Sequence, residues 1–157
     1  MAAFEWLQHT YVGETIRNSA ALIATLEIVH LIGFALLVGT ILMVDLSLLG
    51  FGIGRRPSAE IARELRGWTV AGLAIMLASG PLILCSEAVR CYKSPAFWIK
   101  MALLAIAIAF HFTIHRRVTL AAPPAPHPSA RMVAGLSLAL WFGVALAGKA
   151  IAIFQQT

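Results

Sequence analysis

The sequence predicts an all-α protein: an integral membrane bundle of four helices that run up and down. The first observation is composition, because 60% of the 157 residues are hydrophobic and only 12% are charged. Mean hydropathy is +0.85. A water-soluble domain of this length could not bury so much apolar surface, so we expect the lipid bilayer to be its solvent.

The second observation is that the apolar residues form four long segments. Since about 20 residues at 1.5 Å each cross the hydrocarbon core, each segment can span a membrane. The predicted spans are residues 20–46, 68–86, 96–115 and 132–154. Their short connections predict one bundle, so the whole chain (residues 1–157) forms a single membrane domain.

Basic residues predict the orientation. The connections between spans one and two and between spans three and four hold four plus three, or seven, arginines, against four basic residues on the opposite side. The seven are Arg55, Arg56, Arg63, Arg66, Arg116, Arg117 and Arg131. The positive-inside rule places them in the cytoplasm and both chain ends outside it. It also explains the net charge of +5 without a nucleic-acid partner.

The first 18 residues precede the spans. They carry Glu5 and Glu14 and have no basic start before an apolar core, so we expect no cleavable signal peptide. Phe4, Leu7 and Tyr11 recur at helical spacing, which indicates either a short interfacial helix or a polar tail. At the same membrane face, Cys85 and Cys91 either form a disulfide or remain two thiols.

Several membrane-embedded residues are ionisable, and they concentrate on the first and third spans. An ionised side chain at the bilayer centre costs about 2.5–3.5 kcal/mol, so such residues face other helices or water and indicate functional sites. They are Glu27, His30, Asp45, Lys100, His111 and His115.

Two of the histidines suggest a cofactor. Neutral imidazole is a strong ligand of haem iron, and helical bundles hold cofactors between facing helices. The sequence therefore predicts a haem b site with His30 and His111 as metal-binding axial ligands, and His115 as a reserve ligand one turn beyond His111. Glu27 would orient the His30 imidazole, and Lys100 would meet the haem propionates.

Depth in the membrane gives two answers for this pair. Counted from Arg17 and from Pro95, His30 and His111 lie about 20 Å and about 24 Å deep at 1.5 Å per residue. Counted from the cytoplasmic arginines, their depths differ by well over ~15 Å, because the first apolar run is longer. The pair therefore requires a first helix that protrudes or breaks near residues 50–54. If His30→Ala kept the haem while His111→Ala and His115→Ala each lost it, the site would lie at the cytoplasmic end of the third helix, with Asp45 as its acidic neighbour.

Other functions fit the same residues. His111 and His115, four residues apart, could handle copper or another metal, and the polar residues of the first and third spans could conduct protons or ions. Histidines hydrogen-bonded between helices without iron would leave a non-catalytic anchor or accessory subunit of a respiratory or dehydrogenase complex. No nucleophile elbow, phosphate-binding glycine loop or pair of catalytic carboxylates is present, so we expect a redox subunit rather than an enzyme on its own.

Three sequence stretches carry a family resemblance. They are LEIVHLIGFALLVGTILMVDLSLLG, SPAFWIKMALLAIAIAFHF and a late GKAIAIF. Together they resemble an uncharacterised family of small four-helix bacterial membrane proteins, over residues 19–154. The layout is also similar to the membrane domain of copper-resistance D proteins and to four-helix b-type cytochromes. The cytochrome likeness implies electron transfer in the bacterial inner membrane, with other membrane or periplasmic redox subunits, or a second copy of the chain, as partners.

Reporter fusions test the predicted orientation. Alkaline phosphatase fused after Thr157 should be active, and phosphatase fused after Arg117 should be inactive, because the enzyme needs disulfides that form only outside the cytoplasm. Both fusions should be present in the membrane at similar amounts. The reverse pattern of activity would contradict the orientation with both chain ends outside.

Overall fold

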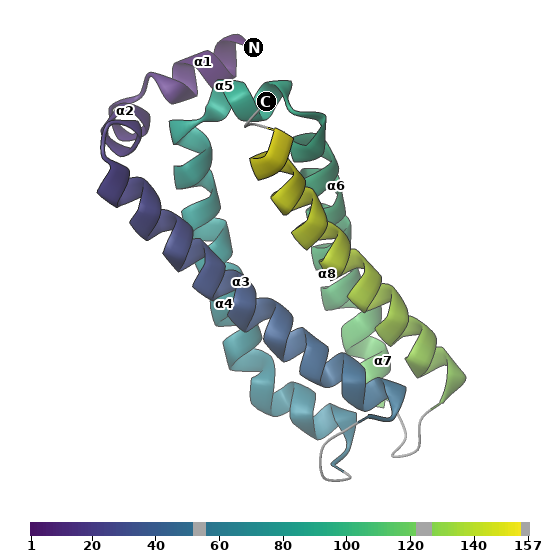
Figure 1. Cartoon of the computed structure of the whole chain (residues 1–157). Coiled ribbons are helices and arrows are strands. Elements are labelled where there is room, and N and C mark those ends of the chain that lie inside the picture. The colour runs from purple at the N-terminus through teal and green to yellow at the C-terminus, as the bar shows by residue number, and fades with distance from the viewer. Residues whose placement is uncertain (52–55, 122–126, 155–157) are drawn as a thin grey trace.

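The computed structural model describes residues 1–51, 56–121 and 127–154, and no strand occurs in these ranges (Figure 1). Residues 52–55, which include part of the predicted break after the first span, lie outside the described residues. The elements are α1 (Ala2–Gln8), α2 (Tyr11–Arg17), α3 (Ala20–Leu49), α4 (Ser58–Ser86), α5 (Ala88–Lys93), α6 (Pro95–Phe110), η2 (His111–His115, a π-helical turn), α7 (Arg116–Ala121) and α8 (Pro128–Phe154).

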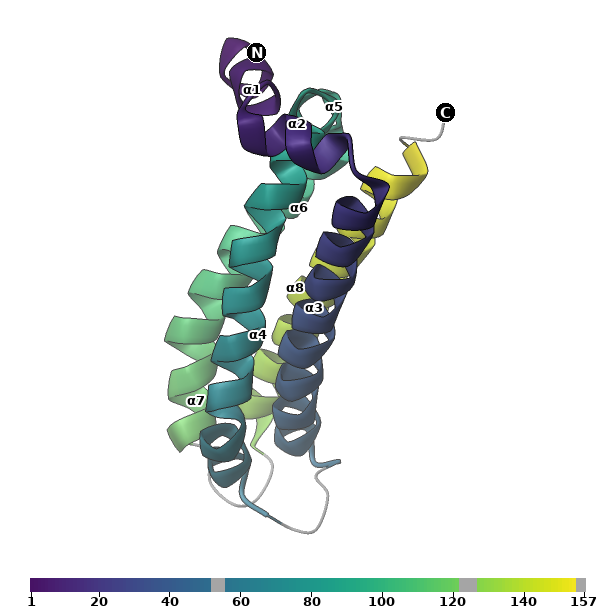
Figure 2. The same cartoon turned by 90° about the vertical axis from the view of Figure 1, so that its left-hand side faces the viewer.

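Among the described residues, four helical segments are long and apolar enough to cross a membrane. They are Ala20–Leu49, Ser58–Ser86, Pro95–Ala121, which combines α6, η2 and α7, and Pro128–Ile151. The two chain ends lie at the same end of the bundle, as an even number of crossings requires (Figures 1 and 2). The prediction of an all-α membrane bundle of four helices is therefore confirmed.

The helices are longer than the predicted spans. α3 begins after Ser19, whose hydroxyl accepts the N–H of Leu22, and it ends at Gly50, which adopts a left-handed conformation with φ 97°. α4 begins ten residues before the predicted start of the second span. Its first turns are polar, and Arg56 bridges Glu60 and Glu64 along them. The third span continues past His115 to Ala121.

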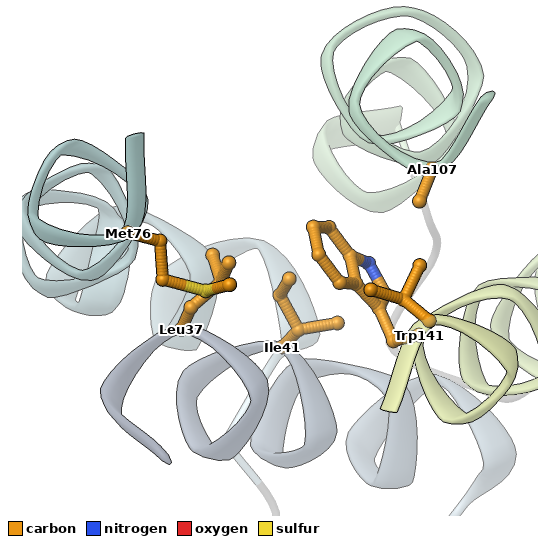
Figure 3. Packing of buried hydrophobic residues seen from close by; sticks show 6 residues of the cluster. Leu37, Ile41, Met76, Ala107 and Trp141 are labelled. Atoms are coloured by element: carbon orange, nitrogen blue, oxygen red, sulfur yellow. The ribbon is translucent and has the colours of Figure 1, made fainter. Parts of the chain in front are cut away.

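The helices pack as two pairs, α3 with α4 and α6 with α8. Glycine lets the first pair approach closely: a Cβ atom on Gly72 would lie 2.7 Å from the backbone nitrogen of Leu37. The two pairs meet in an apolar cluster of Leu37, Ile41, Met76, Ala107, Trp141 and Val144 (Figure 3). A second cluster of Val44, Leu48, Ala130 and Ala134 lies further from the chain ends.

Short helices cover the end of the bundle where the chain starts and finishes (Figures 1 and 2). The residues expected to form one interfacial helix are split between α1 and α2. The Gln8 side chain accepts the backbone N–H of Val89, which fastens α1 to α5. Phe4 and Tyr92 pack together, with ring centroids 5.0 Å apart. These contacts tie the N-terminal segment to the connection between the second and third spans.

The two cysteines are free thiols in the structure, both partly buried. Burial, together with the charge of Glu87, raises the pKa of the Cys91 thiol, which lies on α5 outside the spans. A raised pKa lowers the fraction of thiolate, the form that attacks in disulfide exchange.

The close approach at Gly72 gives a prediction for stability. Gly72→Ala should lower the free energy of unfolding by about 1–3 kcal/mol, because its methyl group meets the backbone of α3, which cannot move aside cheaply. The measurement is reversible unfolding in mixed micelles.

Gly67→Ala is the matched control on the same helix. A Cβ atom there would meet no atom within 4 Å, so its higher helix propensity should stabilise by about 0.5–1 kcal/mol. Equal effects of the two substitutions would show that α3 and α4 do not approach closely at Gly72.

Candidate functional site

A cavity of about 390 Å³ lies between the two helix pairs and is open on one side. Its lining comes from all four long helices and includes His30 and Phe34 on α3, Met76 on α4, Lys100 on α6 and Lys149 on α8. We refer to it as the His30 cavity. Most of its wall is apolar, so the imidazole and the two ammonium groups are the main polar features.

The hydrogen bonds of His30 fix the tautomer of its neutral ring. Nδ1 lies 2.8 Å from the Ser79 hydroxyl oxygen, and this hydroxyl donates its only proton to the carbonyl oxygen of Ile75, 2.7 Å away. The Ser79 oxygen must therefore accept from Nδ1–H, which leaves the lone pair of the ring on Nε2. A metal-binding histidine has this arrangement, with its other ring nitrogen donating to a protein acceptor.

Small residues make room around these groups. A Cβ atom at Gly80 would lie 3.4 Å from Cε1 of His30, so a larger side chain there would press on the ring. A Cβ atom at Gly148 would lie 3.4 Å from Nζ of Lys100, so this ammonium group lies against the backbone of α8. Lys100 and His30 therefore reach the cavity from opposite helix pairs.

Glu27 does not take the predicted role beside His30. Its side chain is exposed, and Ser79 on α4 is the partner of Nδ1. Ser79 is 3% exposed. The sequence prediction of Glu27 as the orienting acceptor is wrong for this structure, because the ring is oriented by a neighbouring helix rather than by its own.

A second polar site lies further along α3. Asp45 is 0% exposed, and its Oδ1 lies 2.6 Å from Nε2 of His115, which is 2% exposed. The short distance between a carboxylate and an imidazole is typical of a charge-assisted hydrogen bond. We refer to it as the Asp45–His115 pair.

The pair sits among buried polar atoms that have no hydrogen-bond partner among the described residues. These atoms are Oδ2 of Asp45, Nδ1 of His111, Oγ1 of Thr119 and Oγ of Ser137. Ser137 lies beside the Asp45 carboxylate, to which its hydroxyl can donate, and Thr119 follows His115 by one turn. Unpartnered buried polar atoms are rare in proteins, so several of them in one region call for an explanation.

His111 packs on His115 instead of reaching His30. The two rings stack with centroids 5.1 Å apart and an interplanar angle of 23°. His30 and Asp45 are 15 residues apart on one helix, or about 22 Å at 1.5 Å per residue. The predicted axial pair of His30 with His111 is therefore corrected: the two histidines lie at different depths, because α3 continues unbroken to Leu49.

The stacked histidines also do not form a chelating pair. Nε2 of His115 is already bonded to Asp45, and stacked rings do not direct their nitrogens to one point. In the part of the chain that the structure describes, no group of three or more His, Cys, Asp or Glu side chains is arranged to hold a metal. This geometry does not favour copper binding by His111 and His115.

Sequence reasoning missed Ser79, Ser137 and Lys149 as members of these sites. Serine in an apolar helix usually bonds the backbone of its own helix. The amino-acid sequence therefore gives no sign that Ser79 also faces a histidine. Lys149, near the end of the fourth span, lines the His30 cavity as well. The signal for Ser79 was its place next to Gly80 and Pro81, where helices can approach closely.

Fold and sites together define a small multi-pass membrane protein with histidines inside its helical bundle. A family model described as a family of unknown function (DUF6644) matches residues 3–154, so the chain belongs to this family. No curated protein and no solved structure matches the chain. The comparisons thus lend no support to the likeness to copper-resistance D membrane domains or b-type cytochromes.

The Asp45–His115 pair gives a prediction for stability. His115→Leu leaves a carboxylate unpaired inside the bundle and should lower the free energy of unfolding by about 3–5 kcal/mol. Asp45→Leu combined with His115→Leu removes both polar side chains and should cost much less than the sum of the single changes. Unfolding of all three variants in mixed micelles measures the coupling.

His127→Leu is the control, because His127 is exposed and its loss should change stability little. Single effects that simply add in the double variant would contradict a coupled pair.

Proposed function

We propose that this protein is a haem b-binding electron-transfer subunit of the bacterial inner membrane, in which His30 would bind the iron. The observation that carries the proposal is the His30 ring. Its Nδ1 is held by Ser79, and its Nε2 has no hydrogen-bond partner among the described residues. A neutral imidazole oriented in this way, lining a cavity inside a bundle, is suited to haem iron.

The His30 cavity suits the rest of such a cofactor. Its volume of about 390 Å³ falls within the usual range of ligand pockets, roughly 300–1,000 Å³. Phe34 and Val144 give it apolar walls that suit a macrocycle. Lys100 and Lys149 provide cations for carboxylate groups, to which ammonium forms strong hydrogen bonds.

The cavity residues would also set the redox properties. Haem supplies one-electron chemistry, and the protein supplies the ligand, the dielectric and the nearby charges. Lys100 and Lys149 line the cavity, and their ammonium groups would disfavour the more positive oxidation state of a bound iron and so raise its reduction potential. The cavity lies in the half of the bundle nearer the chain ends, so we expect a redox partner at that membrane face.

The proposed haem site contains one histidine ligand rather than the two that the sequence predicts. No histidine other than His30 lines the cavity in the described part of the chain. Met76 and Lys100 also line it, and a methionine thioether is the second ligand in cytochromes c. The spectrum of the bound cofactor distinguishes one imidazole ligand from two.

Haem content of purified variants tests the proposal. The wild-type protein should show a reduced-minus-oxidised spectrum of haem b. His30→Ala should abolish it, because the ligand is lost, whereas His111→Ala should retain it, because His111 lies at the other site. Ser79→Ala should weaken haem binding by about 10–100-fold, the usual cost of losing a hydrogen-bond partner behind a ligating histidine.

Ser86→Ala is the matched control for Ser79→Ala. Ser86 is equally buried, at 2% exposed, and bonds only the Ile83 carbonyl. Every variant should stay in the membrane and be monodisperse in detergent. A folded but colourless wild-type protein would contradict haem binding and favour the anchor or accessory role; unchanged haem in His30→Ala would contradict the ligand.

A further inference from the structure

We propose that five exposed arginines form a binding surface for the headgroups of anionic phospholipids. They are Arg63 and Arg66 on α4, Arg116 and Arg117 on α7, and Arg131 on α8. We refer to them as the arginine belt. They lie at the end of the bundle away from the two chain ends, where α7 and the first turns of α4 and α8 are found (Figures 1 and 2). The belt lies in the other half of the bundle from the His30 cavity and does not depend on the proposed haem.

The belt surrounds one apolar cluster. Every belt arginine except Arg116 is a chain neighbour of a residue that belongs to the second apolar cluster or packs against it. These neighbours are Ala62, Leu65, Val118 and Ala130. Because α7 contacts both α4 and α8, the three helices carry the arginines around this cluster at one level of the bundle.

This level is the boundary between hydrocarbon and water. On the side of the belt toward the bundle centre, the same three helical segments expose large apolar side chains, namely Trp68, Ile114 and Met132. On the other side, Arg56 and Glu60 are exposed or partly exposed and charged. The guanidinium groups therefore lie in the layer that holds the phosphate groups of phospholipids.

The belt carries charge that the protein does not neutralise. Apart from the buried Asp45, the described acidic residues at this end of the bundle are Glu60 and Glu64, and both bond Arg56. None of the five belt arginines has an acidic partner among the described residues. Six arginines, with Arg56 included, against two glutamates leave a net charge of six minus two, or +4.

The chemistry of the belt selects the lipid. A guanidinium group is planar and donates two parallel hydrogen bonds to the oxygens of a phosphate. A headgroup with a net negative charge is favoured over a zwitterionic one, because the belt repels the ammonium of the latter. Clusters of basic residues beside a membrane attract anionic lipids in this way. A lipid is favoured over a soluble acidic protein because the arginines lie at headgroup level, next to side chains that face hydrocarbon.

Thermal unfolding of the purified full-length protein in lipid nanodiscs tests the surface. Discs of pure phosphatidylcholine are compared with discs that also contain phosphatidylglycerol. Phosphatidylglycerol should raise the Tm of the wild-type protein, because it binds the folded state. Added salt should reduce this rise, because it screens exposed charges. Mass spectrometry of protein released from mixed discs should show phosphatidylglycerol bound in preference to phosphatidylcholine.

Variants locate the surface. Arg66→Gln combined with Arg117→Gln should lower the preference for phosphatidylglycerol by about tenfold or more, given the usual contribution of a basic residue at an anionic surface. Arg17→Gln combined with Lys93→Gln is the control, because it removes two positive charges at the other end of the bundle, and it should keep the preference. The belt variant should unfold in pure phosphatidylcholine at the wild-type Tm, since neither of its arginines has an acidic partner among the described residues.

Three outcomes would overturn the proposal. The first is a wild-type protein with the same Tm in both kinds of disc and no preference in its bound lipids. The second is a loss of preference in the control variant equal to that in the belt variant, which would indicate general charge attraction. The third is a rise in Tm in phosphatidylcholine discs on adding inorganic phosphate that equals the rise with phosphatidylglycerol, which would indicate a site for the free anion.

Discussion

The structure depends on the constraint that a helix crossing lipid must satisfy its own backbone hydrogen bonds. α3 meets this constraint as one continuous helix from Ala20 to Leu49, because an unpaired backbone group in hydrocarbon costs several kcal/mol. The depths of His30 and Asp45 are therefore fixed relative to each other. The other helices supply partners at these two levels: Ser79 for His30, and His115 for Asp45.

The spans could be predicted from the sequence because apolar run length is a local property. Their ends could not, because a helix continues into the headgroup region where hydropathy no longer marks it. The first turns of α4 are helical although they carry the charged side chains of Glu60 and Glu64, which pair with Arg56 just before the helix. The extension of the third span through Arg116 and Arg117 follows the same rule.

The sequence identifies the ionisable residues of the two sites, but it does not predict which of them contact each other. Glu27 and Asp45 are 18 residues apart, which is five full turns, so they share one face of α3. Yet Asp45 is buried and Glu27 is exposed. Asp45 lies at the level where the second apolar cluster packs against α3, whereas Glu27 lies beyond both clusters, toward the chain ends. Which residue of a face is covered depends on how neighbouring helices diverge, and local sequence patterns do not carry that information.

The π-helical turn also decides where this helix can change in length. A π turn holds one more residue than the α-helical turn it replaces. Losing a single residue between His111 and His115 would therefore restore a regular helix and leave Thr119 and the arginines of α7 close to their present faces. Losing a residue from the regular part of α6 would instead rotate everything after it by about 100°. Within the third span, this turn is thus the place where the chain can lose one residue and still direct the same side chains into the bundle.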